Sequence, residues 1–313
     1  MSEDEEFNIE KLPVIRTLAK WCKKVKIPGT NGLSLYHLLE IYGTGIIKGT
    51  FSSRASSIAY SFFIAIFPFL LFILNLIPYF DFIDGFLTQF LIFIEELLPP
   101  QTADLFYPVI ADIAVNPRGG LLSFSIILAI FLSANGVNAI FSAFEYSVHV
   151  TINRTFVRQY AVAFGVAILL ALLLLTTVGV ILYGEYLINE LVGKVYVENN
   201  VYLVTIMQLV IFISMIYTII SILYYFGTKQ GKESHFFSFG ALLTTILFLV
   251  TTYLFGIYIN NFSNYNELYG SLGALLIMLF YIWINSNLLL LGFELNVSLQ
   301  LLKDRNKNNN TNT

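Results

Sequence analysis

The stretch AVAFGVAILLALLLLTTVGVILY, residues 161–183, contains no charged side chain. A bilayer core about 30 Å thick needs about 20 such residues to be crossed by a helix. The whole chain has the same character: of its 313 residues, 57% are hydrophobic and 12% are charged, whereas soluble domains carry about 25% charged residues. The apolar residues lie in long blocks, which excludes a soluble enzyme, a disordered protein and a coiled coil. The sequence therefore predicts a polytopic membrane protein.

Five further blocks resemble the first in length and composition. The predicted membrane-spanning stretches are residues 55–80, 121–144, 161–183, 201–226, 237–259 and 272–295. Each is expected to be a helix, because open strand edges cannot be satisfied in lipid. The predicted fold is all-α, with six transmembrane helices in a membrane domain at 51–300. A segment at 1–50 precedes it, and an Asn-rich polar tail at 301–313, expected to be disordered, follows.

The basic residues predict the orientation of these spans. With the N-terminus in the cytoplasm, all of the 17 Lys and Arg except Arg118 and Lys194 lie on the cytoplasmic side. Cytoplasmic loops of membrane proteins carry an excess of Lys and Arg, whereas acidic residues contribute little to topology. We therefore expect both termini in the cytoplasm.

The segments outside the spans predict contact with the membrane surface. Residues 7–27 form an amphipathic pattern with a basic remainder, typical of a helix that lies on an anionic leaflet or packs on the inner loops. In the first outer loop, 81–118, the apolar piece 86–98 is too short to span, and a second amphipathic piece follows it. We expect short interfacial helices there. Membrane lipids are thus predicted partners, while protein partners and homo-oligomerisation stay open.

The residue types that carry catalysis are sparse. Cys22 is the only cysteine, and the histidines at 37, 149 and 235 fall in separate segments without a metal-ligand spacing. The sequence has no phosphate-binding loop, dinucleotide fingerprint or HExxH motif. We therefore predict a protein that is not an enzyme, with no catalytic residue, metal, cofactor or nucleic-acid partner.

Polar residues inside the predicted spans gather in the cytoplasmic half. At about 1.5 Å per residue, Asn138 lies about 26 Å below Leu121, and Asn285 and Glu294 lie about 20 Å and 33 Å below Leu272. Such residues usually face the bundle interior. They predict a polar pocket open to the cytoplasm between the first, second and last spans. The candidate pocket residues are Tyr60, Ser61, Asn135, Asn138, Asn287 and Glu294.

Two interpretations of these polar residues stay open. Amide and hydroxyl groups also link helices in membranes, at about 0.6 kcal/mol per interaction, so the same residues are compatible with purely structural contacts. Glu294 and Glu145 fall near the inner headgroups by the same arithmetic. We expect both carboxylates to be solvated at the interface rather than to relay protons.

Three local motifs carry a resemblance to a known family over residues 35–300. They are Arg54-Ala55 with Tyr60 and Phe67-Pro68 in the first span, Tyr265-Asn266 with Tyr269-Gly270-Ser271-Leu272-Gly273 before the last, and Gly292-Phe293-Glu294-Leu295-Asn296 at its end. With six spans and a long first outer loop, this pattern resembles the BrkB/YihY family of bacterial inner-membrane proteins. Ala65, Gly227 and the Asn135-Gly136 pair depart from the family pattern.

The resemblance implies a bacterial inner-membrane protein without an assigned biochemical activity. Some members of the family carry a ribonuclease name. That chemistry needs metal ligands, or an acid and a base beside a basic groove, and the sequence offers neither. Two functions remain: a transporter or translocator of lipids or solutes that uses the polar pocket, and a membrane scaffold that recruits partners through its basic cytoplasmic segments.

Overall fold

The structure, a computed structural model, describes residues 50–76, 122–145, 155–192, 200–227, 236–262 and 271–311, together with 88–89, 91–92 and 108. Six long helices make up this part of the chain, and it contains no strand. They are α3 (Thr50–Leu76), α6 (Leu122–Glu145), α7 (Phe156–Val192), α8 (Asn200–Gly227), α9 (Phe239–Phe262) and α11 (Ser271–Thr311). The prediction of an all-α fold is confirmed, and each predicted span falls on one of these helices.

Four segments of the described chain are long and apolar enough to cross a membrane. They are Phe156–Ile188, Tyr202–Gly227, Phe239–Ile259 and Leu275–Gln300. Large apolar side chains on these segments point outward, among them Leu172 on α7, Leu209 on α8 and Leu254 on α9. A contiguous apolar exterior of this kind is unfavourable in water and favourable against lipid tails. Length, composition and surface therefore agree on a membrane protein.

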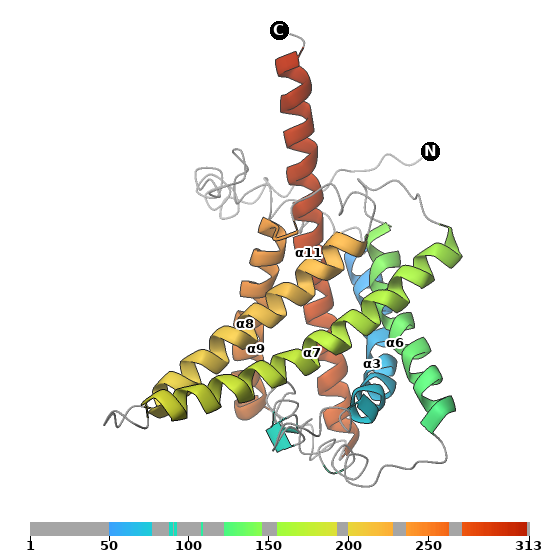
Figure 1. The fold of residues 1–313 in the computed structure, drawn as a ribbon. Coiled ribbons are helices and arrows are strands. Elements are labelled where there is room, and N and C mark those ends of the chain that lie inside the picture. The colour runs from blue at the N-terminus through green and yellow to red at the C-terminus, as the bar shows by residue number, and fades with distance from the viewer. Residues whose placement is uncertain are drawn as a thin grey trace.

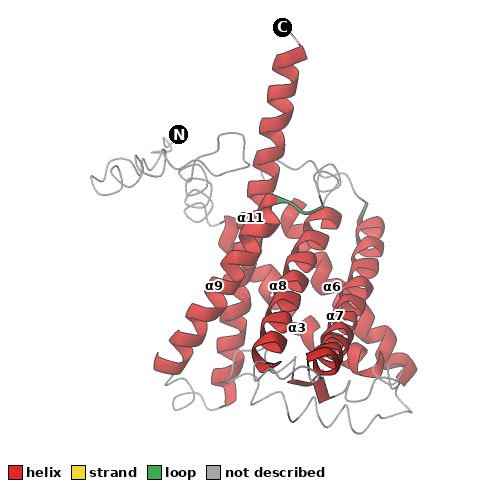
Figure 2. Cartoon of the chain, turned by 60° about the vertical axis from the view of Figure 1, so that its left-hand side comes forward, coloured by secondary structure: helices red, strands yellow, loops and turns green. Residues whose placement is uncertain are grey.

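The helices form a closed ring in chain order. α3 packs on α6, α6 on α7, α7 on α8, α8 on α9 and α9 on α11, and α11 completes the ring against α3 (Figure 1). α6, α8 and α11 run in one direction and α3, α7 and α9 in the other, as expected for consecutive spans. α7 and α8 tilt strongly relative to α11 (Figure 1), and the end of α11 extends beyond the rest of the bundle (Figure 2).

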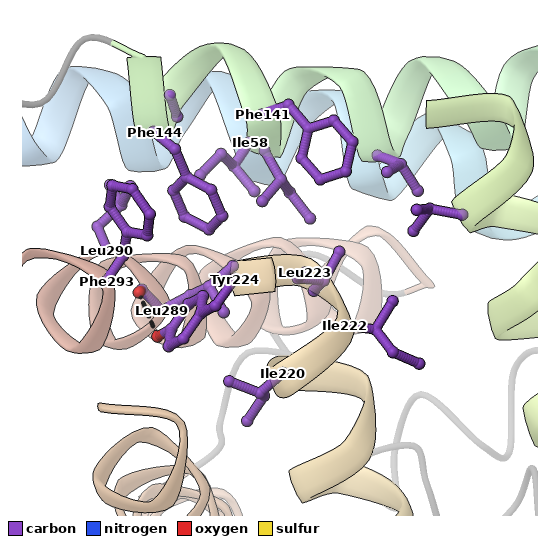
Figure 3. Packing of buried hydrophobic residues seen from close by; sticks show 14 of the residues in the cluster. Ile58, Phe141, Phe144, Ile220, Ile222, Leu223, Tyr224, Leu289, Leu290 and Phe293 are labelled. Atoms are coloured by element: carbon purple, nitrogen blue, oxygen red, sulfur yellow. Dashed lines mark hydrogen bonds between the residues drawn. The ribbon is translucent and has the colours of Figure 1, made fainter. Parts of the chain in front are cut away.

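The main core lies at one end of this ring. It draws residues from all six helices, and Phe144 and Phe293 stack at its centre with ring centroids 4.1 Å apart (Figure 3). The ring of Tyr224 meets both of them edge-on, at 5.7 Å and 5.9 Å. We call Phe144, Tyr224 and Phe293 the aromatic layer. We call the end of the bundle where α3 begins and α6 and α8 end the Arg54 end.

The structure extends the last helix beyond the sequence expectation. Disorder is expected from residue 301, whereas α11 continues to Thr311. Once the preceding turns have nucleated a helix, each added residue gains one hydrogen bond at little cost, so polar residues can prolong it. The expectations for residues 1–49, for most of the first outer loop and for Tyr265, Asn266, Tyr269 and Gly270 lie outside the described residues. Pro68 lies within α3, and Gly273 is buried in α11.

Candidate functional site

The segment Gly292–Asn296 lies at the Arg54 end of α11, where four other helices meet it. Gly292 allows α9 to approach closely: a Cβ atom there would stand 2.9 Å from the carbonyl oxygen of Gly240 and would collide with Thr244 Oγ1. It would also stand 2.6 Å from the hydroxyl oxygen of Tyr224. Only a residue without a side chain fits between these groups.

Tyr224 fixes α8 to α11 through its hydroxyl group. The hydroxyl donates to the carbonyl oxygen of Leu289 at 2.7 Å and lies 2.8 Å from Thr244 Oγ1. Thr244 also bonds the carbonyl oxygen of Gly240, one turn earlier in α9. A buried tyrosine normally finds a partner for its hydroxyl, and here the partners come from α9 and α11.

Asn296 closes the first turn of α9. Its Oδ1 accepts from the backbone N–H of Gly240 at 2.8 Å, and its Nδ2 donates to Ser238 Oγ at 2.7 Å. Ser238 is itself the N-cap of α9, because its Oγ accepts from the N–H of Ala241 at 3.2 Å. The first N–H groups of a helix have no partner within it, so an amide supplied by α11 satisfies a group that lipid could not.

Arg54 and Glu294 form a buried ion pair between α3 and α11. Their closest atoms are 3.4 Å apart, and their side chains are 11% and 5% exposed. Arg54 also donates to the carbonyl oxygen of Ala143 in α6 at 3.2 Å, and its guanidinium lies 4.8 Å from the ring centre of Phe51. One cation therefore connects three helices.

The expectation that Glu294 is solvated at the interface is wrong. Depth along the helix places Glu294 near the headgroups, but α3 covers it and Arg54 neutralises it. A carboxylate with a cationic partner can be buried, whereas an unpaired one cannot. Glu145, the other carboxylate of that expectation, is half-buried.

The predicted pocket residues do not all face one space. Tyr60 is 65% exposed and points away from the bundle. Ser61 is half-buried where α3 meets α6: its carbonyl oxygen would lie 3.6 Å from a Cβ atom on Gly136. Asn135 accepts a hydrogen bond from Tyr160 of α7 at 3.0 Å, which makes it a contact between two helices.

The remaining two predicted amides are buried or partly buried. Asn287 is buried and donates to the carbonyl oxygen of Trp283 in its own helix at 2.8 Å. Asn138 is half-buried, but its Oδ1 is buried and has no hydrogen-bond partner among the described residues. The sequence could not distinguish Asn138 from Asn135, because both lie in the same part of the same helix.

Three buried oxygens lack a partner in the described part of the chain: Asn138 Oδ1 in α6, Ser221 Oγ in α8 and Asn285 Oδ1 in α11. We call them the three unpaired oxygens. Their helices run in the same direction, and all three lie beyond the aromatic layer as seen from the Arg54 end, within about 12 Å of it along the helix axes. Native proteins pair the great majority of such groups, so three at comparable depth are notable. All three can accept a hydrogen bond.

An apolar groove lies elsewhere, between α7 and α8. It has a volume of about 410 Å³ and is lined by Leu169, Leu172, Leu173, Thr176, Ile222, Phe226 and Phe236. It is not the polar space that the sequence predicts between the first, second and last spans.

The comparisons with known proteins agree with this architecture. The model of the family described as Virulence factor BrkB matches residues 45–313. The chain belongs to the BrkB family. A ribonuclease-like protein, YfkH, of Bacillus subtilis is 28% identical to this BrkB-family chain over 257 residues, covering 80% of this chain and 90% of the relative. A UPF0761 membrane protein of Coxiella burnetii is 24% identical over 242 residues, covering 76% and 84%. No solved structure matches the chain.

The structure gives each residue of the Gly292–Asn296 motif a contact with another part of the bundle. Gly292 and Asn296 bind α9, Glu294 binds α3, and Phe293 stacks on α6. Leu295 is buried in a small cluster with Phe239 and Leu243 of α9. The sequence missed the contributions of Tyr224, Thr244 and Ser238, because hydroxyl residues near span ends are common. For Arg54, the sequence did offer a signal, because it is an isolated charged residue at the start of an apolar span.

Proposed function

We propose that this BrkB-family membrane protein is a translocator of lipids or solutes, with a polar pocket lined by the three unpaired oxygens. The observation that carries the proposal is that these oxygens are buried in an apolar bundle and have no partner among the described residues. A buried polar group left unpaired costs about 1–3 kcal/mol, so a bundle selected only for stability would replace it. A ligand that donates hydrogen bonds would satisfy all three.

The topology completes the proposal. We infer that α3 and α6 also cross the membrane, giving six spans, and that the Arg54 end faces the cytoplasm. The support is the charge pattern of the sequence, in which Lys and Arg avoid the opposite side. The protein is then an inner-membrane protein with both termini in the cytoplasm, and the pocket lies in the cytoplasmic half.

An activity as an enzyme is not part of this proposal. The described residues contain no group of three or more His, Cys, Asp and Glu side chains close enough to hold a metal ion. Membrane lipids are the partners that the apolar exterior favours, and neither a cofactor nor a nucleic acid is required.

The alternative is a scaffold in which the polar residues only link helices. Asn135 with Tyr160 and Gln159 with Ser142 are such links between α6 and α7. Because these residues bond to side chains of a neighbouring helix, we assign to the proposed pocket only polar residues that lack such an interhelical bond. A scaffold that works through its basic N-terminal segment would lose function when residues 1–27 are deleted.

The test compares two amides of α6. Asn138→Leu removes an unpaired oxygen, so it should leave abundance unchanged and abolish complementation of a deletion strain. Asn135→Leu, the matched control, strands the Tyr160 hydroxyl and should lower stability by about 0.6 kcal/mol, with function following protein abundance. Full complementation by Asn138→Leu/Asn285→Leu at normal abundance would end the pocket proposal.

A further inference from the structure

We propose that Arg54 is a binding site for the phosphate group of an anionic ligand, which replaces Glu294 as the counter-ion of the guanidinium. The inference names a ligand class for the proposed translocator and rests on that function. It is carried by the geometry of the Arg54–Glu294 pair, by its depth and by the open face of α3 next to it.

The ion pair has a loose geometry. Nη1 and Nη2 of Arg54 both donate to the same carboxylate oxygen, Oε1 of Glu294, at 3.4 Å. Charge-assisted hydrogen bonds are typically about 2.7–2.9 Å long, and the preferred arrangement of arginine with a carboxylate or phosphate is two parallel bonds to two oxygens. These two bonds are therefore longer than the charge-assisted bonds that a guanidinium can make. A phosphate group can supply such bonds.

Counted along α11, the pair falls near the cytoplasmic end of the last predicted span. Glu294 is about 33 Å along α11 from Leu272, and the hydrocarbon core is about 30 Å thick. Arg54 lies in the first turns of α3, at the same end of the bundle. Since an arginine fully inside the hydrocarbon would be costly, this position at its edge is where a guanidinium can meet a headgroup.

An exposed face of α3 adjoins Arg54. Ser53 and Ser57, one before and three after Arg54, are exposed. Residues three apart are neighbours on a helix surface, so Ser57 lies beside Arg54 on α3. The Arg54 side chain itself keeps 11% of its surface exposed.

Exchange of the counter-ion would change how the helices are held. Removing one partner of a buried pair is strongly destabilising, so an arriving anion would compensate Arg54 for the loss of Glu294. The bond from Arg54 to Ala143 keeps α3 on α6, while the ion pair between α3 and α11 is lost. Ligand binding is thereby coupled to the contact between α3 and α11 at the Arg54 end.

The experiment measures binding by the full-length protein in neutral maltoside micelles. Phosphatidic acid is titrated and the unfolding midpoint is followed, with diacylglycerol as the lipid without phosphate and glycerol phosphate as the headgroup without lipid. The wild type should show a saturable rise with phosphatidic acid and none with diacylglycerol. A rise with glycerol phosphate as well indicates a site for the phosphate group from either source. A rise with phosphatidic acid alone indicates a lipid headgroup.

Four variants test how changes at the site alter the binding of phosphatidic acid. Glu294→Gln removes the competing carboxylate and should tighten phosphatidic acid binding about tenfold, the size of one charged hydrogen bond. Arg54→Gln should abolish binding, and Arg54→Lys, which keeps the charge but loses the planar fork, should weaken it and serves if Arg54→Gln does not fold. Arg158→Gln, at an exposed arginine of α7, should bind as the wild type does.

Three results would overturn the site: equal shifts with diacylglycerol, unchanged or weaker binding by Glu294→Gln, or wild-type binding by both Arg54 variants. A purely structural pair predicts lower starting midpoints for these variants and no ligand-dependent difference between them. The outcome is separate from that of the translocator proposal. If Asn138→Leu fails to complement but the wild type binds no phosphate, the pocket proposal stands and the Arg54 site does not. If the wild type binds phosphate but the Asn138→Leu/Asn285→Leu variant complements fully, the Arg54 site stands and the pocket proposal does not.

Discussion

The rings of Phe144 and Phe293 lie flat against each other, with centroids 4.1 Å apart and planes 8° apart. Both side chains are among the most deeply buried in the protein. One belongs to α6 and the other to α11, two helices that otherwise make few contacts. The stack is therefore a main part of the connection between these two helices.

Truncation of this stack should be costly. We expect Phe293→Ala to destabilise the protein by about 3–5 kcal/mol, because it leaves a buried cavity beside Phe144 and Tyr224. Phe164→Ala, at an outward-facing phenylalanine of α7, should cost much less. Thermal unfolding in detergent, followed by fluorescence-detected size exclusion, checks both. Equal losses for the two variants would show that the stack carries no special weight.

The close approach of α9 to α11 predicts opposite effects for two glycines of α9. A Cβ atom on Gly240 would collide with the carbonyl oxygen of Gly292 and stand 2.5 Å from Asn296 Oδ1, whereas a Cβ atom on Gly256 meets nothing within 4 Å. Gly240→Ala should therefore lower stability by about 1–3 kcal/mol. Gly256→Ala should leave it unchanged or raise it by up to about 1 kcal/mol through helix propensity. If the unfolding midpoint rises for both glycine variants, α9 and α11 are not packed this closely at Gly240.

The buried pair predicts a non-additive pair of substitutions. Glu294→Leu alone takes the carboxylate away from the partly buried Arg54 charge and should cost about 3–5 kcal/mol. The double variant Arg54→Met/Glu294→Leu should recover most of that loss, because apolar residues of similar volume replace both charges. A double-mutant cycle on unfolding midpoints measures the recovery. If the two losses simply add, the residues do not interact in the folded protein.

The proposed orientation predicts a labelling pattern in intact cells. Cys22 is the only native thiol and should be protected from an impermeant thiol reagent. In a Cys22→Ser background, a cysteine at Thr102 in the predicted outer loop should react. If the wild-type protein is labelled and the cysteine at residue 102 is not, the orientation is the opposite of the one proposed.

The helices were predictable because membrane insertion depends on local composition. A run such as 161–183 is long enough and apolar enough to define a span without knowledge of any other part of the chain. The same dependence on local sequence limited the prediction of the candidate site. Glu294 is buried because of a residue 240 positions earlier, and a distance along α11 contains no information about that partner.

The polar residues show the limit most clearly. Asn135 and Asn138 are three apart on α6, and depth arithmetic treats them alike. In the structure Asn135 accepts a bond from Tyr160, whereas Asn138 Oδ1 has no partner among the described residues, because a hydrogen bond depends on which side chain of another helix lies within reach. Tyr60 likewise belongs to a polar stretch of α3 but lies on its outer face. Rotation about the helix axis, which composition does not specify, decides these outcomes.

The cap that Asn296 places on α9 restricts how the bundle can move. α11 cannot rotate about its own axis without stripping the first turn of α9 of its hydrogen bonds in a medium that offers no replacement. α9 and α11 must therefore travel as one rigid body. The opposing body is α3 with α6, and the contacts between the two bodies include the Arg54–Glu294 ion pair and the stack of Phe144 on Phe293. Parallel ring faces can slide past each other while staying in contact, so we expect movement of one body against the other to run along the plane of these rings.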